Sequence, residues 1–297
     1  MKRAAIVIAV LGMCAGSFGQ SNNKPAGQTS QPAQPAGQAT QPAGQAAAAA
    51  PQGKRPPQAK TQPEYEAYKA ASAQTDPAAL EKAADDFAAK FPDSELRALV
   101  YTAAMQRYQQ AYNADKMIDM GKKILAIDPD DPAALVGVSQ ALAERTRETD
   151  LDKDERNAEA KKYAEHALVT IDTDVPSTGY PPDQLAAFKN FLRSVAYGVL
   201  GTISFKASSW ADAETNLRKS IDVLPQQPDT LVVFRLAVAL DMQNKYPEAM
   251  KYADQAVDLT KDRPDSGVGK ASRDEKDRLT KLSVGTAPGQ TTAPPKN

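Results

Sequence analysis

Residues 210–228, WADAETNLRKSIDVLPQQP, decide the fold of this chain. Small and bulky apolar residues recur in this stretch at helical spacing, as at Ala213 and Leu217, until Pro225 ends the pattern. The stretch also holds Trp210, the only tryptophan among the 297 residues. A lone tryptophan is either a ligand contact or a packing residue, and the surrounding pattern has to decide between the two.

The same order of residue sizes occurs twice in succession. On the first helix the order is two large residues followed by a small one. On the second helix it is an aromatic residue, a small residue, a residue that is either bulky or small, and a final small residue. The first copy consists of Tyr197, Leu200, Gly201, Trp210, Ala213, Leu217, Ser220 and Pro225. The second copy consists of Val233, Leu236, Ala237, Tyr246, Ala249, Ala253 and Ala256. Small residues such as Gly201 and Ala213 allow two antiparallel helices to approach closely, and the bulky ones fill the space between layers.

This pattern resembles the tetratricopeptide repeat, whose period is about 34 residues. Ala213 and Ala249 lie 36 positions apart, which implies a two-residue insertion. The resemblance weakens toward the N-terminus, where Tyr101, Ala104 and Pro129 still fit the second pair. It implies an all-α solenoid of about five antiparallel helix pairs, wound as a right-handed superhelix over residues 64–283. Trp210 and Tyr246 then occupy equivalent positions and act as packing wedges.

Helical periodicity and proline positions place the individual helices, and alternating β-branched runs typical of strands are absent. A single pair cannot bury its apolar face, whereas stacked pairs can. A polar capping helix is expected after residue 259. The ten expected helices cover residues 64–73, 77–91, 94–111, 114–127, 132–145, 156–171, 183–207, 209–223, 229–243 and 246–260.

The N-terminal residues 1–19 are predicted to be an export signal. Lys2 and Arg3 precede a short apolar run, and the small residues Ser17 and Gly19 favour cleavage before Gln20. The run is too short for a spanning helix, so we expect a periplasmic or secreted protein with no membrane span in its mature chain. The less favoured alternative is a lipoprotein anchored through Cys14, because Met13 is bulky where a lipobox carries a small residue.

Two flanking segments lack the apolar residues that a core requires. Residues 20–63 repeat the phrase PAGQ and contain no Val, Ile, Leu, Met, Phe, Trp or Tyr, so we expect a disordered linker. Residues 284–297 have a similar composition and are expected to form a disordered tail.

Composition argues against several classes of function. Lys and Arg number 36 against 37 Asp and Glu, so no polyanion or nucleic-acid partner is indicated. One cysteine and one histidine, His166, argue against metal sites and nucleophilic triads. Asp150, Asp152 and Asp154 resemble the start of a calcium loop, but the required glycine and glutamate are missing. We expect no enzyme activity, no catalytic residues, no metal and no cofactor.

The repeat resemblance implies a concave groove lined by the first helix of each pair, which binds a peptide or protein. The groove residues so implied are Thr102, Gln106, Gln140, Thr202, Phe205, Phe234 and Asp241, and in a wider set Gln109, Val136, Glu144, Gly198, Lys206 and Val238. Phe205 and Phe234 are the expected anchors, with packing against a neighbouring helix as the competing explanation. The Lys and Asn residues with which some family members hold a C-terminal carboxylate are absent from the second and third pairs.

The expected function is a non-catalytic protein-interaction scaffold in the cell envelope, with a partner whose identity stays open. One alternative is an envelope assembly component resembling the repeat lipoproteins of outer-membrane assembly, suggested by the motif FPDSEL at residues 91–96. A second alternative is an unrecognised hydrolase, which would need a carboxylate pair in a closed pocket.

Overall fold

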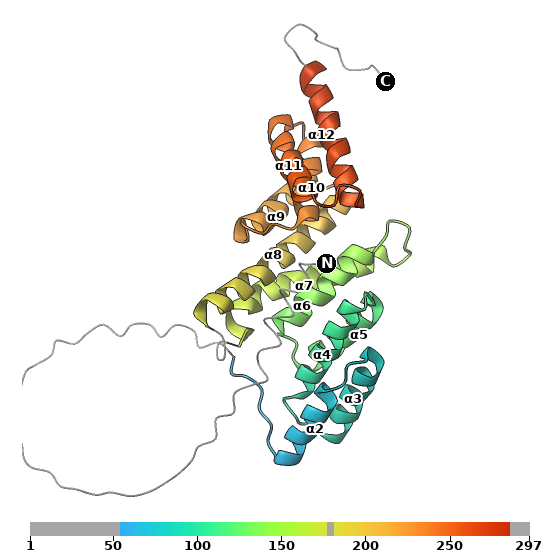
Figure 1. Cartoon of the computed structure of the whole chain (residues 1–297), viewed down its shortest axis with the longest axis vertical. Coiled ribbons are helices and arrows are strands. Elements are labelled where there is room, and N and C mark those ends of the chain that lie inside the picture. The colour runs from blue at the N-terminus through green and yellow to red at the C-terminus, as the bar shows by residue number, and fades with distance from the viewer. Residues whose placement is uncertain (1–53, 177–180, 286–297) are drawn as a thin grey trace, which may run out of the picture. The chain divides into compact units, whose positions relative to one another are not determined.

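The computed structural model describes residues 54–176 and 181–285, without the side chains of 283–285 (Figure 1). The predicted signal peptide, Cys14, residues 20–53 of the predicted linker and residues 286–297 of the predicted tail lie outside the described residues.

The described residues form eleven α-helices and contain no strand, so the all-α prediction is confirmed. Ten of these helices match the expected ones, and the eleventh is the expected capping helix. They are α2 (Gln62–Ser72), α3 (Pro77–Lys90), α4 (Arg97–Gln110), α5 (Ala114–Ile127), α6 (Pro132–Arg145), α7 (Lys153–Asp174), α8 (Pro182–Lys206), α9 (Trp210–Val223), α10 (Thr230–Asp241), α11 (Tyr246–Leu259) and α12 (Gly267–Gly285).

Each helix packs against the next one along the chain, which gives the pairs α2/α3, α4/α5, α6/α7, α8/α9 and α10/α11 (Figure 1). Several first helices of neighbouring pairs also contact one another: α2 contacts α4, α6 contacts α8, and α8 contacts α10. We call the surface formed by α4, α6, α8 and α10 the first-helix face. The terminal helix α12 covers α11 and α10, and the fold is therefore a helical solenoid with a capping helix.

Helix starts follow from local chemistry. Asp76, Asp131 and Asp229 precede α3, α6 and α10, and each side chain accepts a hydrogen bond from a free backbone N–H of the first turn. Pro77 and Pro132 follow two of these caps, where a missing N–H costs nothing. These signals explain why the expected boundaries agree with the structure to within a few residues.

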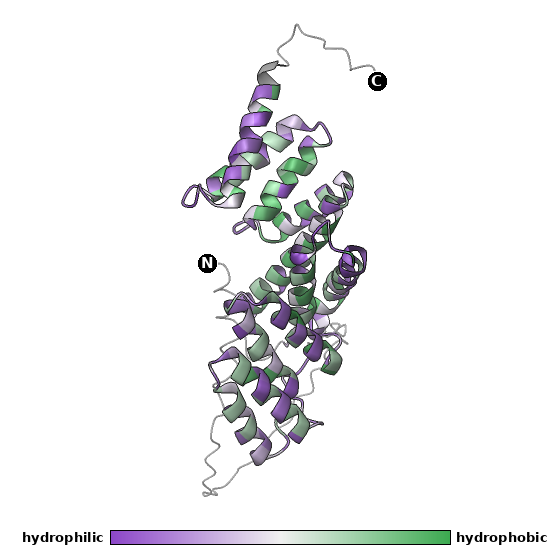
Figure 2. Cartoon of the chain, turned by 90° about the vertical axis from the view of Figure 1, so that its right-hand side faces the viewer, coloured by the Kyte–Doolittle hydropathy of each residue, from purple (hydrophilic) through white to green (hydrophobic). Residues whose placement is uncertain are grey.

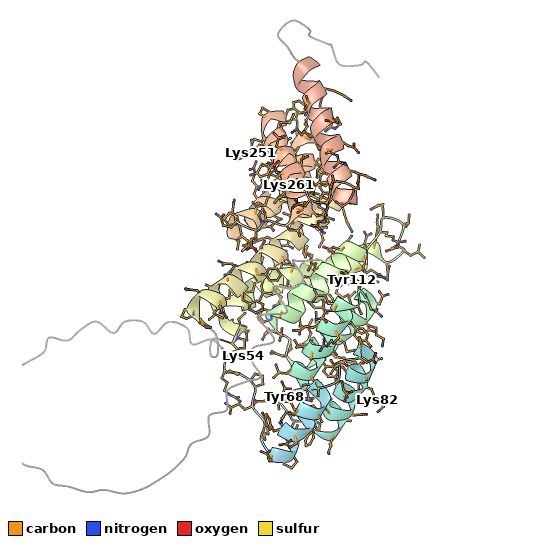
Figure 3. The ribbon with its side chains drawn as sticks, viewed as in Figure 1. Lys54, Tyr68, Lys82, Tyr112, Lys251 and Lys261 are labelled. Carbon is orange, nitrogen blue, oxygen red and sulfur yellow. The ribbon has the colours of Figure 1, made fainter. Side chains whose placement is uncertain are left out.

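The turn inside three of the pairs uses one backbone device. Tyr112, Ser208 and Asn244 have φ values of 56°, 56° and 61°, and each lies two residues before the second helix of its pair. A left-handed residue at this place reverses the chain within a few residues, although it is unfavourable for a tyrosine. The Tyr112 side chain is 79% exposed at this turn (Figure 3). The recurrence is independent evidence that the pairs are repeats.

Gly201 lies at a close approach between α8 and α9. A Cβ atom on Gly201 would lie 2.6 Å from Leu217 Cδ2 and 3.1 Å from the Leu217 backbone nitrogen. Gly121 plays a similar part between α5 and α6, where an added Cβ would lie 2.3 Å from Val138 Cγ2. Close helix contact therefore depends on the absence of a side chain at these positions.

The expected repeat positions differ in their burial. The small and aliphatic residues Gly201, Ala213, Leu217, Leu236, Ala249 and Ala256 are buried, and Tyr197, Leu200, Trp210 and Tyr246 are half-buried. Pro225 lies two residues beyond the end of α9. The helix with the highest mean hydropathy, α10, is green over most of its length in Figure 2.

The structure differs from expectation at two boundaries. Helix α7 runs from Lys153 to Asp174, longer than the expected 156–171, and carries Asp154 and Glu155 in its first turn, where the helix dipole favours acids. Residues 54–61, expected within the linker, lie against the helices. Arg55 Nη2 is 2.5 Å from Glu95 Oε1, and Lys54 Nζ is 2.5 Å from Asp128 Oδ2. The composition of these residues indicated only that they bury little apolar surface. In the structure, ion pairs hold them against the helices.

Replacing Gly201 with alanine should lower the free energy of unfolding by about 1–3 kcal/mol, because the new methyl group overlaps the buried Leu217. Elsewhere in a helix the same change stabilises by about 0.5–1 kcal/mol. Urea unfolding followed by circular dichroism measures the change. Gly267→Ala is the control, since an added Cβ there meets nothing within 4 Å. Equal stability of Gly201→Ala and the wild type would contradict the close-approach argument.

Candidate functional site

Charged side chains on the second helices are engaged with one another. Tyr108 Oη donates to Glu81 Oε2 at 2.5 Å, and Lys116 Nζ lies 2.8 Å from Glu81 Oε1. Burial raises the pKa of the Glu81 carboxyl, but the hydrogen bonds from Lys116 and Tyr108 outweigh it, and the pKa ends below its ordinary value. Burial, with the Glu81 carboxylate adding to it, raises the pKa of Tyr108 to about 12. The network joins α3, α4 and α5.

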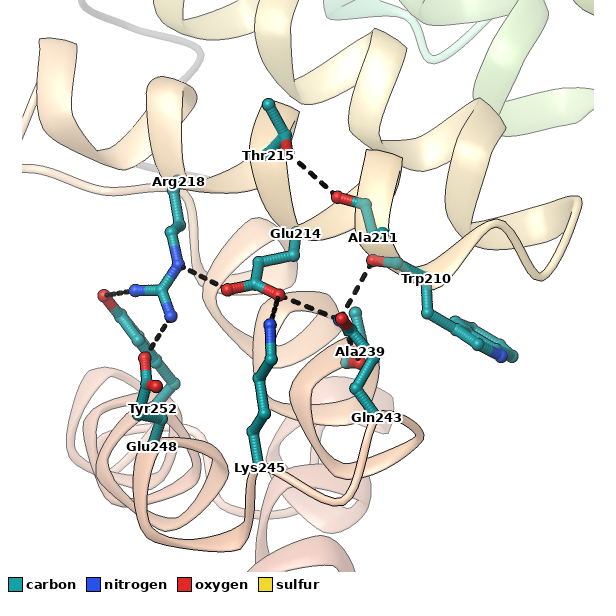
Figure 4. Close-up of polar contacts among 10 residues, drawn as sticks. All are labelled: Trp210, Ala211, Glu214, Thr215, Arg218, Ala239, Gln243, Lys245, Glu248 and Tyr252. Carbon is teal, nitrogen blue, oxygen red and sulfur yellow. Dashed lines mark hydrogen bonds and ion pairs between the residues drawn. The ribbon is translucent and has the colours of Figure 1, made fainter.

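A second network joins α9 to α11 (Figure 4). The Glu214 carboxylate accepts from Arg218 Nε at 3.0 Å, from Gln243 Nε2 at 2.9 Å and from Lys245 Nζ at 2.6 Å. Arg218 also donates to Tyr252 Oη at 3.1 Å. These carboxylates and cations connect neighbouring repeats, and their partners are within the chain.

The carboxyl groups with raised pKa values also have structural roles. Burial is the main cause that raises the pKa of Asp131 and of Glu275. Asp131 caps α6, and Glu275 accepts a hydrogen bond from Arg278 Nε at 3.1 Å within α12. They lie on different helices and serve different contacts, so they give no support to the hydrolase alternative.

A hollow of about 480 Å³ lies between α5, α6 and α7 on the side of the second helices. Two of its lining residues, Ile118 and Leu142, are apolar, and the rest of the lining is charged. The lining residues are Asp115, Ile118, Asp119, Lys122, Leu142, Asp152, Glu155, Arg156 and Glu159. Lys122 pairs with Glu159 at 2.8 Å and Arg156 with Asp152 at 2.7 Å, so ion pairs cross the hollow and its rim.

The candidate ligands for a metal have other roles. Asp150 Oδ2 accepts from the Arg147 backbone N–H at 2.9 Å, and Asp152 pairs with Arg156. His166 Nε2 lies 2.7 Å from Asp130 Oδ1. Within the described residues, no three His, Cys, Asp or Glu side chains are grouped as a metal ion would require.

The structure places the expected groove residues on α4, α6, α8 and α10, but it does not leave all of them free. The Thr102 hydroxyl donates to the Ala98 carbonyl within α4, and Gln140 Nε2 donates to Glu144 Oε1 at 3.3 Å. Gln106 is half-buried on α4. Asp241 is buried and pairs with Arg278 of α12, so it holds the capping helix.

The two phenylalanines belong to the C-terminal core cluster. Phe205 and Phe234 are both partly buried and pack against its buried residues. The Phe205 ring meets the ring of Trp210 edge to face, with centroids 5.4 Å apart. Trp210 is the first residue of α9 and Phe205 lies near the end of α8, so this contact joins the two helices of one pair. In the structure, all three aromatic rings therefore pack against neighbouring side chains.

Two cations lie beside these phenylalanines on the first-helix face. Arg235 of α10 donates from Nη1 to Thr202 Oγ1 of α8 at 2.7 Å. Lys206, one helical turn after Thr202, donates to the carbonyls of Ala143 and Thr146 at 2.5 and 2.6 Å. These contacts connect α6, α8 and α10 at one place. Burial lowers the pKa of both Lys206 and Arg235, and the charge of Arg235 lowers the pKa of Lys206 further.

We call Thr202, Lys206 and Arg235 the basic cluster. Thr202 and Lys206 were among the residues implied by the repeat frame, whereas Arg235 was missed. Position 235 follows Phe234 inside an apolar run, TLVVFRLAVALD, and a charged residue in such a run is the signal that could have identified it.

Comparisons with known proteins identify no family. No protein-family model matches the chain, and no curated protein matches its sequence. Among solved structures, the chain is similar to the assembly chaperone of RpL4 (Acl4, residues 1–338). The TM-score is 0.42 with 11% sequence identity, over 75% of this chain and 99% of that chain. The fold description therefore depends on the helices and contacts given above. None of the described helices combines the length and apolar character needed to cross a membrane.

Replacing Glu81 with glutamine should remove a stabilisation that depends on pH. The folded pKa of Glu81 is below the ordinary value of 4.5, so its contribution is full above that pH. It is lost as the pH falls through the lowered folded value. The difference in unfolding free energy between wild type and Glu81→Gln should therefore be largest at neutral pH and shrink in acid. Urea unfolding at a series of pH values measures it, with exposed Glu66→Gln as the control. A difference that grew as the pH fell would contradict the ion-pair network.

Proposed function

We propose that this chain is a non-catalytic protein-interaction scaffold that binds its partner on the first-helix face. The observation that carries this proposal is the half-buried cation Arg235 on the first-helix face, compared with the ion-pair networks of the second helices. On the second helices, the cations and carboxylates of the networks described above pair with one another. On the first-helix face, Arg235 has a threonine hydroxyl as its partner and forms no ion pair with any described residue.

The partner is a protein or peptide. The first helices α6, α8 and α10 contact one another in sequence and offer an elongated surface, and solenoids use such surfaces to bind extended partners. The networks of the second helices support this assignment, because side chains already satisfied within the chain have less to offer a partner.

The scaffold acts in the cell envelope or outside the cell. This part of the proposal depends on residues 1–19, whose charge and apolar pattern are typical of an export signal. Residues 20–53 of the predicted linker would then separate the helical unit from its point of export.

Site-specific photo-crosslinking in cells tests the binding surface. A photoreactive residue at Gln106 or Gln140, on α4 and α6, should give a discrete crosslinked product. The same residue at Lys82 or Lys251, on the second helices α3 and α11, should not (Figure 3). The physical reason is that a partner seated on the first-helix face lies out of reach of the opposite side. Products from Lys82 or Lys251, with none from the glutamines, would place the partner on the wrong face and overturn the proposal.

Mass spectrometry of the mature protein tests export. We expect an N-terminus at Gln20, because Ser17 and Gly19 are the small residues that a signal peptidase recognises. Gly19→Arg should block processing and keep the precursor, whereas Gly12→Ala, inside the apolar run, should not. A mature chain beginning at Cys14 with the mass of a diacylglycerol would instead show a lipoprotein and reject soluble export.

A further inference from the structure

We propose that the basic cluster binds a single Asp or Glu side chain of the partner protein, with Arg235 as the main contact and Lys206 as a second positive charge. This inference depends on the proposed function, because it names the chemistry that the first-helix face recognises.

The position of Arg235 is held by its neighbour. The Thr202 hydroxyl donates to the Gly198 carbonyl at 2.7 Å within α8, which leaves its oxygen free to accept from Arg235 Nη1 at 2.7 Å. Thr202 itself is only 3% exposed, so this acceptor is fixed in place. The guanidinium is therefore oriented before any ligand arrives, and preorganisation reduces the entropic cost of binding.

The guanidinium has unused donors. It carries five N–H groups, and among the described residues its hydrogen-bond partner is Thr202. No described carboxylate lies within ion-pair distance of Arg235 or Lys206. Arg55, Arg156, Arg193 and Arg218 each pair with a carboxylate. Arg235 is half-buried, so water compensates for the missing partner less than it does for an exposed arginine.

The surroundings of the cluster favour a single carboxylate over a polyanion. A guanidinium fits a carboxylate through two parallel hydrogen bonds, and such charge-assisted pairs are stronger than neutral ones. A polyphosphate would need a broad basic surface, whereas acidic residues act electrostatically on the two cations from several sides. These residues are Glu144, Glu148, Asp150 and Asp229.

The carboxylate side chain comes from another molecule. Residues 1–53, 177–180 and 286–297 contain no aspartate or glutamate, so these parts of the chain have no acidic side chain to place on the cluster. Acidic residues within the helical unit occupy the positions described above, and none of those described pairs with Arg235. A segment of a different protein that places one Asp or Glu side chain on the cluster fits this requirement.

Fluorescence anisotropy with the full chain tests the inference. The probe is a labelled six-residue peptide with blocked ends that carries one glutamate among five glutamines, and the reference is the matching six-glutamine peptide. The wild type should bind the glutamate peptide in preference to the glutamine peptide. Arg235→Gln should weaken that binding by about tenfold or more, as loss of one charge-assisted pair implies. Lys206→Met should weaken it less, since two of the Lys206 donors are occupied by carbonyls of α6.

Arg263→Gln is the matched control, because it changes the net charge equally at an exposed arginine after α11. It should leave glutamate binding within about twofold of the wild type. Equal loss in both arginine variants, or no preference of the wild type for glutamate, would overturn the inference. If Arg235→Gln fails to fold, the Arg235 Nε–Hε resonance of the wild type should shift during titration with the glutamate peptide, and an unmoved resonance would overturn it.

The crosslinking experiment separates this inference from the proposed function. If Gln140 crosslinks a partner equally in wild type and Arg235→Gln, the scaffold stands and the carboxylate inference fails. If no first-helix position crosslinks a partner, the proposed function fails as well. Self-association of the chain in analytical ultracentrifugation, abolished by Arg235→Gln, would assign the carboxylate to a second copy and overturn the assignment to a different protein.

Discussion

Close approach between neighbouring helices is the contact on which the rest of this structure depends. Within one pair, at Gly201, the backbone of α8 comes so near α9 that a single methyl group would overlap Leu217. Between two pairs, a methyl group on Gly121 of α5 would overlap Val138 of α6 in the same way. Pairs packed this tightly present a continuous apolar side to the next pair, and the next pair covers it. The alanines that follow, Ala213 and Ala249, are fully buried for the same reason.

Stacking of this kind gives the solenoid two chemically different sides. Second helices of adjacent pairs meet through long polar side chains, as in the contact of Lys122 with Glu159 and that of Arg218 with Tyr252. These contacts cross between repeats and connect the second helix of one pair to that of the next. First helices meet through buried aliphatic residues and a few polar ones, and Thr202 receives the guanidinium of the following repeat.

Much of the fold could be predicted from the sequence because its signals are local. Asp131 followed by Pro132 marks the start of α6, and Pro225 marks the end of α9, so the boundaries of the helices were recovered closely. The contacts that join repeats could not be predicted this way, because the partners lie about a repeat apart or further. Glu81 and Lys116 are 35 positions apart, and Lys206 reaches Ala143 across 63 positions. The role of Asp241 was missed for the same reason, since its partner Arg278 belongs to the capping helix.

The unpaired state of Arg235 is informative because it is unfavourable. Removing a guanidinium from water without a carboxylate partner costs free energy, and an apolar side chain of similar size in this run would fit the neighbouring valines and leucines better. A charged residue within an apolar helical run is unfavourable for folding, and proteins retain such residues where function requires them. Other contacts then supply the lost folding free energy. Here the compensating contacts are the buried Thr202 hydroxyl and the core of leucines and alanines around α10. A ligand that supplies the missing charge recovers part of that cost on binding, which makes Arg235 a favourable place for an acidic partner.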